Sequence, residues 1–274
     1  MPRNGQASFK PARPVAVFAL DFEQGASTGR HAHPFGQLVH AAAGVMRVLT
    51  ARGAWVVPPG RAVWVPPRMP HEVQMVTSVA MKTVYVTGEA LPHAPQESCV
   101  VEVSPLLREL ILRALSLPRP YPLGGPEERL FRVLLDQASF HDVVPVHLPR
   151  PRGAPLREIA RRLERDPSDP RTLPQWADLV GCSARTLARA FRAETGLSFG
   201  AFRGQLRLLR GLELLALRQP VTEVALALGY ESTSAFIHRF RSHFGTTPAR
   251  WFGGSPTDGA SAPTAGPRRG MLRR

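Results

Sequence analysis

The sequence predicts an α+β protein of two domains, with a β-barrel or β-sandwich in the N-terminal half and helices throughout the C-terminal half. Residues 14–90 form short apolar runs rich in Val, Trp and Thr, which Gly or Pro interrupts every several positions. From residue 156 to residue 252 the apolar residues recur with the spacing of amphipathic helices. The net charge is +14, and residues 150–274 hold 21 Lys or Arg against 10 Asp or Glu, whereas residues 1–149 hold 14 against 11. A basic helical domain favours a polyanionic partner such as nucleic acid.

The strands of the first domain, residues 1–100, are predicted from six runs, in order PVAVFALDF, QLVHAAAGVMRVLT, GAWVVPPG, RAVWVPP, HEVQMVT and AMKTVYVTG. Five prolines separate them: Pro58, Pro59, Pro66, Pro67 and Pro70. Proline has no N–H for a β-ladder, so we expect these residues at strand ends or edges.

Two helices and a linker are predicted over residues 101–150. Residues 104–117 have apolar positions at helical spacing, and Ser104 with Pro105 supplies a helix start. Residues 126–142 repeat the period. These helices either complete the core of the first domain or form a dimer interface, and the sequence leaves both alternatives open. The proline-rich stretch 143–155 is predicted to be a linker.

Within residues 151–253, two segments predict helix-turn-helix units, at 173–194 and 221–244. Each has a short helix, a glycine turn at Gly181 or Gly229, and a second helix that starts after a capping serine. An ordinary αα-hairpin is the alternative for one such segment, but two copies favour DNA binding. The joining helix over 198–218, roughly 30 Å long, could hold the two second helices in successive major-groove segments, because one turn of B-DNA is about 34 Å. On the second helices a spacing of four predicts that Leu187 and Phe191, and Phe236, Phe240 and Phe244, face inward. The outward positions of the second helices are Arg185, Ala188, Arg189, Arg192, Thr233, Ser234, Ile237, His238 and Arg241.

Other features narrow the class of protein. No apolar run approaches the roughly 20 residues that cross a bilayer, and the N-terminus shows no secretory signal. Cys99 and Cys182 form no recognisable disulfide framework or metal pair. We therefore expect a cytoplasmic protein without a membrane partner, ending in a disordered basic tail at 254–274.

The helical domain resembles the DNA-binding domain of AraC/XylS-type transcription regulators. The resemblance rests on G-x-S-x-x-x-L-x-R-x-F-x-x-x-x-G at 181–196, on the Arg207–Leu208 pair, and on A-x-x-x-G-Y-x-S-x-S-x-F-x-x-x-F-x-x-x-F-G-x-x-P-x-x-W-F at 225–252. It implies that bases are read by Arg185, Ala188, Arg189, Thr233, Ser234 and His238. Arg192 and Arg241 are better placed for phosphates. Ala188 offers only a methyl contact, and Gly211, where the family usually has alanine, would cost up to about 1 kcal/mol of helix stability.

A second pattern lies in the first domain. G-x5-H-x-H-x3-Q-x6-G, from Gly25 to Gly44, and G-x5-P-x4-H, from Gly60 to His71, are similar to the two motifs of cupins, which are small jelly-roll β-barrels. The resemblance implies that His31, His33, Gln37 and His71 face one spot in the barrel. Residue 37 is usually glutamate in metal-binding cupins, and residue 68, here arginine, is usually glycine. Gln37 keeps an oxygen donor but removes the charge that a hard metal prefers.

Three interpretations of these four residues remain open. The barrel is a metal-dependent enzyme fused to a DNA-binding domain, or a sensor that holds Fe, Mn, Ni or Zn, or a metal-free effector pocket lined by the histidines. A structural nucleic-acid protein is a further class, which the sensor-like barrel disfavours. The prediction is a non-enzymatic, homodimeric transcription regulator that binds promoter or operator DNA and a small-molecule effector, and that contacts RNA polymerase if it activates. Residues 44–73 and 81–86 also resemble a subgroup that includes a repressor of nitroimidazole efflux, which does not identify the effector.

Overall fold

The computed structural model describes residues 11–138, 140 and 146–253, so the predicted tail at 254–274 lies outside the described residues. The strands are β1 (Val15–Phe22), β2 (Gly36–Ala43), β3 (Met46–Thr50), β4 (Gly53–Val57), β5 (Arg61–Val65), β6 (His71–Met75), β7 (Val79–Val86), β8 (Cys99–Glu102) and β9 (His147–Pro149). The helices are α1 (Pro105–Leu115), α2 (Pro126–Asp136), α3 (Ala154–Arg165), α4 (Leu173–Leu179), α5 (Ala184–Thr195), α6 (Phe199–Ala216), α7 (Val221–Ala227), α8 (Thr233–Phe244) and α9 (Pro248–Gly253).

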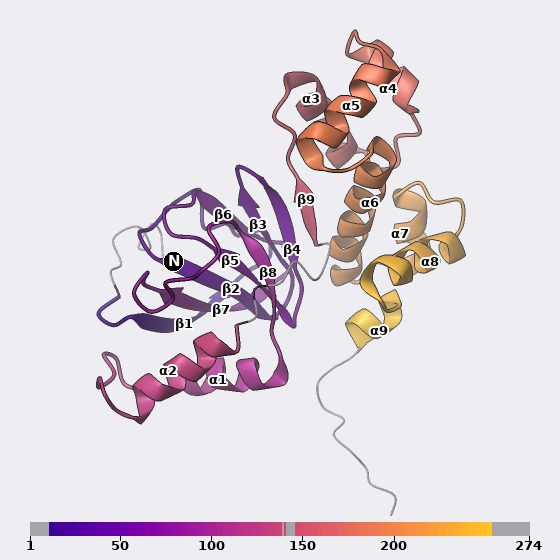
Figure 1. The fold of residues 1–274 in the computed structure, drawn as a ribbon. Helices are drawn as coiled ribbons and strands as arrows, with labels where there is room; N and C mark the ends of the chain where they lie inside the picture. Colours follow the sequence, from indigo (N-terminus) through magenta and orange to yellow (C-terminus); the bar gives the residue numbers. More distant parts are fainter. Residues whose placement is uncertain (1–10, 139, 141–145, 254–274) are drawn as a thin grey trace, which may run out of the picture.

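The strands form two antiparallel sheets that face each other, as predicted for the first domain (Figure 1). One sheet has the strand order β1-β7-β2-β5-β8 and the other has the order β6-β3-β4-β9. The prolines lie at the ends of strands, as predicted: β4 ends before Pro58, β5 ends before Pro66, and β6 starts after Pro70. Alternate residues of each strand point into the space between the sheets, where Val39, Val48 and other apolar side chains form the barrel core.

The outer face of the five-stranded sheet is covered by α1 and α2 (Figure 1). Leu107 and Ile111 of α1 and Phe131 of α2 belong to one buried cluster with Leu38 and Trp64 of the sheet. Residues 36–41 of β2 are therefore buried on both faces, and His40 lies in this layer with Nδ1 donating to the carbonyl of Arg61 at 2.9 Å. The structure shows that the inner sides of these helices complete the first domain's core.

The elements between the two domains differ from the predicted boundaries. The boundary at residue 100 falls inside β8, which pairs with β5. The predicted linker 143–155 contains β9, which pairs with β4, and the start of α3. The second predicted helix, 126–142, ends at Asp136. A strand of three or four residues has too few positions for an alternation of apolar and polar side chains to be recognised. β8 and β9 were therefore not predicted among the neighbouring prolines.

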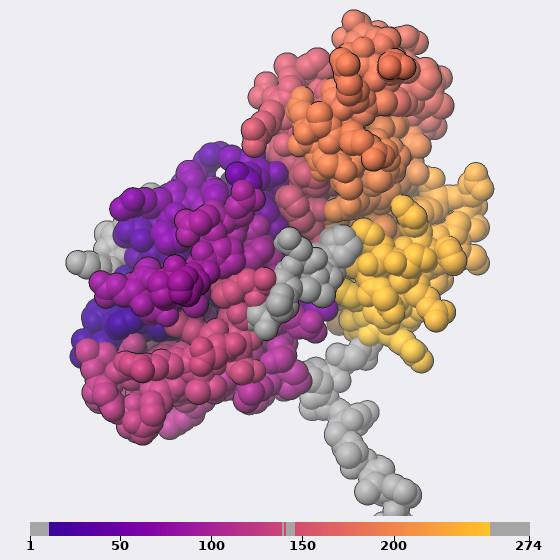
Figure 2. Space-filling model, viewed as in Figure 1, coloured from indigo at the N-terminus to yellow at the C-terminus, as the bar shows by residue number. Residues whose placement is uncertain are grey.

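The helical domain, α3 to α9, is built around α6, and β9 lies between α6 and the barrel (Figure 1). The barrel and the helical domain are two lobes in contact (Figure 2). Arg47 of β3 forms an ion pair with Glu213 of α6 across this contact. Within the part of the chain that the structure describes, no helix is both long and apolar enough to cross a lipid bilayer.

Candidate nucleic-acid interface and histidine cluster

The first predicted helix-turn-helix unit is formed by α4 and α5. Gly181 has a φ of 71°, which allows the tight turn, and the Oγ atom of Ser183 accepts a hydrogen bond from the N–H of Thr186 at 3.1 Å. Leu187 and Phe191 are buried, as predicted from their spacing of four. This packing directs the opposite face of α5 to solvent.

The outer face of α5 is strongly basic. Arg185, Ala188, Arg189 and Arg192 are all exposed. Because Ala188 ends at Cβ, it leaves a shallow concavity that Arg189 and Arg192 also line. The face therefore combines cationic side chains with a small apolar contact point.

The second unit is formed by α7 and α8, with Gly229 at a φ of 71° in the turn. The Oγ atom of Ser232 accepts a hydrogen bond from the N–H of Ala235 at 3.1 Å, and Phe236 and Phe240 are fully buried. The predicted outward residues are exposed at Ser234, His238 and Arg241 and half-buried at Thr233.

Two predictions for α8 were inaccurate. Ile237 was expected to face outward but is half-buried against the core of this unit, and Phe244 was expected to be buried but is half-buried. Phe244 lies next to Trp251 of α9, at 5.2 Å between ring centroids. An apolar side chain flanking the buried stripe of a short helix is drawn toward the core, which a strict spacing of four does not anticipate.

Both units are held by α6, which has 18 residues and is about 27 Å long. Phe199 and Phe202 pack against Phe191 of the first unit. Gly211 is buried against the second unit, and an added Cβ would lie 3.0 Å from carbons of both Leu228 and Phe236. Glycine at this position therefore permits close packing of α6 under α8, which explains the departure from the expected alanine.

The basic groups on both outer faces are available to a partner. Within the described residues, no carboxylate pairs with the guanidinium groups of Arg185, Arg189, Arg192 or Arg241. On α3, by contrast, Arg161 is neutralised by Glu158. An unpaired cationic face is what phosphate and guanine contacts require.

The structure brings His31, His33 and His71 together in the barrel domain. Ligand atoms of the three imidazoles lie within 4.8 Å of one another. His31 and His71 face each other in an isolated antiparallel bridge, with ring centroids 4.3 Å apart, and the rings of His33 and His71 are 5.1 Å apart. His33 and His71 are buried, and His31 is half-buried.

The backbone fixes the orientation of all three imidazoles. The Nδ1 atoms donate to carbonyl oxygens: His31 to Gly29 at 2.9 Å, His33 to Phe35 at 2.7 Å, and His71 to Met69 at 2.9 Å. A carbonyl can only accept, so each neutral ring carries its proton on Nδ1 and keeps a lone pair on Nε2. The buried Nε2 of His31 has no hydrogen-bond partner among the described residues.

Gln37 of β2 completes the cluster. Its Oε1 lies 2.9 Å from Nε2 of His33 and 3.1 Å from Nε2 of His71, and its amide nitrogen donates to the hydroxyl oxygen of Thr83 at 2.8 Å. Burial lowers the pKa of His33, and it lowers the pKa of His71 to about 4, so both rings are neutral near pH 7. In this arrangement three imidazole lone pairs and an amide oxygen converge with no proton among them, which is the donor set that a divalent cation accepts.

If the Gln37 amide is rotated by 180°, its oxygen and nitrogen exchange places and the hydrogen-bond donors and acceptors of the cluster change. The amide nitrogen would then donate to Nε2 of His33 and His71, and the oxygen would accept from the hydroxyl group of Thr83. That arrangement satisfies these groups without a cation, and it is the one that a metal-free pocket requires. The roles of Thr83 and Tyr85, which surround the Gln37 amide, were not predicted, because they depend on strand register.

Two helix-turn-helix units on one spine, with basic outer faces and a β-barrel that encloses a polar cluster, define the class of two-domain DNA-binding transcription regulators. Family models match both halves of the chain: residues 15–172 match the AraC-like ligand binding domain, and residues 176–254 match a helix-turn-helix domain. The chain therefore belongs to the AraC family of transcription regulators, which confirms the predicted family and fold class.

Individual relatives agree with this class. The chain is 34% identical over 221 residues to the HTH-type transcriptional regulator NimR of Escherichia coli (strain K12), a match that covers 81% of each protein. It is 40% identical over 111 residues to the HTH-type transcriptional regulator RipA of Corynebacterium glutamicum, covering 40% of this chain and 33% of RipA. A structure of ToxT from Vibrio cholerae covers 87% of this chain and 98% of that chain at 7% identity, with a TM-score of 0.36.

Proposed function

We propose that the chain binds double-stranded DNA in two successive segments of the major groove, one read by α5 and the other by α8. The observation that supports this most directly is the pair of capped, basic outer faces on the single spine α6. The spine is about 27 Å long, and one turn of B-DNA is about 34 Å, so both second helices can reach one face of the duplex.

The side chains suggest a division of roles. Arg185 and Arg189 can each form two hydrogen bonds with O6 and N7 of guanine, and Ala188 can contact a thymine methyl group. On α8, Thr233, Ser234 and His238 supply less selective donors and acceptors. Arg192 and Arg241 add affinity through phosphates, without sequence preference.

The test is selection of bound duplexes from a random library with the full chain, followed by footprinting. We expect two protected major-groove segments about one helical turn apart. Arg185→Ala should weaken protection of one segment and His238→Ala that of the other, whereas Arg113→Ala, on α1 of the barrel domain, should change neither. A single protected segment, or loss of both segments in each variant, would contradict the proposal.

We further propose that the barrel holds one divalent cation through Nε2 of His31, His33 and His71 and Oε1 of Gln37. The support is the unpartnered buried Nε2 of His31 and the convergence of acceptors on one point. Fe, Mn, Ni and Zn all accept imidazole ligands. The cation would supply a Lewis-acidic coordination position for an effector, and the neutral amide of Gln37 would make its binding weaker and more exchangeable than a carboxylate would.

The metal content of protein purified without a histidine tag or added metal tests this proposal. Plasma mass spectrometry should find near one equivalent per chain, which His31→Ala and His71→Ala lose and the exposed His93→Ala retains. Removal by a chelator should lower the midpoint of thermal unfolding, because a cation that binds only the folded state stabilises it. Substoichiometric, mixed metal with no change in the midpoint would indicate the metal-free pocket.

We infer that the barrel is a sensor and not an enzyme. The matched relatives are transcription regulators, and Gln37 removes the charge that a catalytic hard-metal site generally uses. Turnover of a substrate by the metal-loaded chain would contradict this inference.

The remaining partners are proposed from the surface and the class of protein. Leu106 and Leu112 of α1 and Val133 of α2 are exposed by 52%, 42% and 43%. This apolar surface supports a homodimer through the outer side of the helix pair. As a regulator of promoter DNA, the protein is proposed to act in the cytoplasm and to contact RNA polymerase if it activates transcription.

A further inference from the structure

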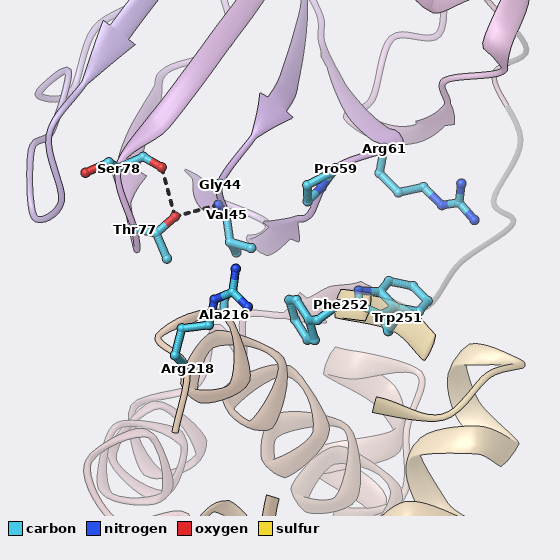
Figure 3. A pocket seen from close by; sticks show the side chains of 10 residues that line it. All are labelled: Gly44, Val45, Pro59, Arg61, Thr77, Ser78, Ala216, Arg218, Trp251 and Phe252. Atoms are coloured by element: carbon cyan, nitrogen blue, oxygen red, sulfur yellow. Dashed lines mark hydrogen bonds between the residues drawn. The ribbon is translucent and has the colours of Figure 1, made fainter. Parts of the chain in front are cut away.

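A cavity of about 540 Å³ lies between the two domains, at the end of the barrel that faces α6 and α9 (Figure 3). Its upper wall is formed by barrel turns that contain Gly44, Pro59 and Thr77. Its lower wall is formed by the end of α6 and by α9. Cavities of this size commonly hold small organic molecules, and junctions between domains are common places for them.

The barrel side of the cavity is a fixed surface. Thr77 joins two turns, because its Oγ accepts from the N–H of Val45 at 2.9 Å and donates to the carbonyl of Ser78 at 3.0 Å (Figure 3). Gly44 has a φ of 80°, and a Cβ there would lie 2.1 Å from the oxygen of Ser78. Only glycine fits this turn, so the wall is held in one shape before any ligand arrives.

Arg218 contributes the cation of the cavity. It follows the last turn of α6, with its N–H bonded to the carbonyl of Leu215, and its φ is 65°. Glycine is favoured at this helix-end position, and the same conformation after α5 and α8 is indeed taken by Gly196 and Gly245. Arg218 therefore occupies a position that glycine would adopt at a lower conformational cost.

The guanidinium group of Arg218 extends from α6 toward Val45 across the cavity (Figure 3). It has no ion-pair or hydrogen-bond partner among the described residues. Among the residues that the structure describes, no Asp or Glu lines the cavity, and the second arginine, Arg61 at the far rim, is already paired with Glu102. The electrostatic environment therefore favours an anion beside Arg218.

The apolar side of the cavity is aromatic and leads to a DNA-reading helix. Trp251 and Phe252 of α9 line the cavity and are half-buried. The ring of Trp251 packs against Phe244 at 5.2 Å and against Phe240 at 6.0 Å, and these two residues belong to the inner face of α8. A molecule that stacks on Trp251 would thus contact the support of the second recognition helix.

We propose that this cavity binds a small aromatic carboxylate, with the carboxylate on Arg218 and the ring against Trp251 and Phe252. Such a ligand contacts the barrel turns and the α9 support of α8 at once, so it stabilises one arrangement of the two domains over others. This coupling to DNA rests on the proposed DNA-reading function, whereas ligand binding itself does not.

The test uses 1-naphthoate and its neutral analogue 1-naphthamide as probes on the full chain. Calorimetry should show that naphthoate binds at least about tenfold more tightly than naphthamide, because the paired charge distinguishes them. The sequence has four tryptophans, of which Trp55, Trp64 and Trp176 are buried. With 5-fluorotryptophan incorporated, fluorine NMR should show a shift in one resonance, which Trp251→Phe removes.

Arg218→Gly separates binding from folding, because glycine adopts this backbone conformation readily. We expect unchanged or higher thermal stability, at least about tenfold weaker naphthoate binding, and unchanged naphthamide binding. Arg218→Asn should behave in the same way, and Arg165→Gln, outside the cavity, should bind naphthoate like the wild type. Naphthoate should also change the affinity for the selected duplex.

Absent naphthoate binding, equal affinity for the two probes, or wild-type binding by Arg218→Gly would overturn the inference. If such a protein still binds its duplex, the proposed function stands. Binding without any change in duplex affinity would overturn the coupling to α8. A protein that binds naphthoate but selects no duplex would support the cavity site and contradict the DNA-reading proposal.

Discussion

The ion pair between Arg47 and Glu213 joins the two domains, and removing it tests how much this contact stabilises the folded protein. Glu213 of α6 is 1% exposed, and its Oε1 accepts from Nε of Arg47 at 2.8 Å while its Oε2 accepts from Arg210 at 2.9 Å. Removing Arg47 leaves a buried carboxylate with one partner. Loss of a buried pair costs about 3–5 kcal/mol. Because Arg47 is 33% exposed and Arg210 remains, we expect Arg47→Met to cost about 2 kcal/mol.

The reasoning also predicts an asymmetry between variants. Glu213→Gln removes the charge but keeps an oxygen that Arg47 can donate to, so we expect a smaller cost of about 1 kcal/mol. The double variant Arg47→Met with Glu213→Leu removes the buried charge altogether and should regain most of the stability lost in Arg47→Met.

Urea unfolding of the full chain, followed by circular dichroism, measures these free energies. The buried cluster that includes Val48 and Val56 of the barrel also includes Phe202 of α6, so we expect the junction to unfold as part of a cooperative unit. Arg52→Met is the matched control, because Arg52 and its partner Glu97 are exposed by 51% and 62%, and it should cost less than about 1 kcal/mol. The reasoning is refuted if Arg47→Met is no more costly than this control, or if the double variant is as unstable as Arg47→Met.

Three further predictions concern the DNA face, the spine and the histidine cluster. Arg185→Ala and Arg189→Ala should each weaken binding to the selected duplex by about 1–3 kcal/mol and relax the sequence preference of the protein. Arg192→Ala should instead reduce the salt dependence of binding, and fluorescence anisotropy at several salt concentrations measures affinity and salt dependence together. Unchanged affinity in the first two variants would contradict the assignment of α5 as a DNA-reading helix. Gly211→Ala gains about 1 kcal/mol of helix propensity, but the added methyl group crowds the core under α8 at a cost of about 1–3 kcal/mol. Urea unfolding should therefore show a lower free energy of unfolding. A higher value would show that α6 and α8 can move apart to accommodate the methyl group. In metal-free protein, burial lowers the pKa of His71 to about 4, against about 6.5 in the unfolded chain, so its contribution of up to about 3 kcal/mol to the free energy of unfolding is present above pH 6.5 and is lost as the pH falls toward 4. Urea unfolding at several pH values should show that the free energy of unfolding depends less steeply on pH in His71→Gln. Equal slopes would contradict the burial of a neutral ring.

The sequence alone determined the class of each domain and most of the candidate interface. Apolar periodicity and glycine turns located both helix-turn-helix units, because the spacing of Leu187 and Phe191 and of Phe236 and Phe240 reports directly which face of a helix is buried. The exposed positions of Arg185, Arg189 and His238 follow from the same period. The resemblance to the cupin motifs implied that His31, His33 and His71 face one spot, which the distance between them along the chain does not show.

Only the tertiary structure decided the features that depend on contacts between distant segments. It assigned α1 and α2 to a second buried cluster on the outer face of the five-stranded sheet, and it placed β9 in the predicted linker. It showed that Thr83 faces the Gln37 amide, that Glu213 is buried against Arg47, and that Arg218 faces the barrel turns across a cavity. None of these leaves a local periodic signal, because each depends on strand register or on the packing of one domain against the other. Sequence therefore identified which residues carry chemistry, whereas packing between elements decided which of them act together.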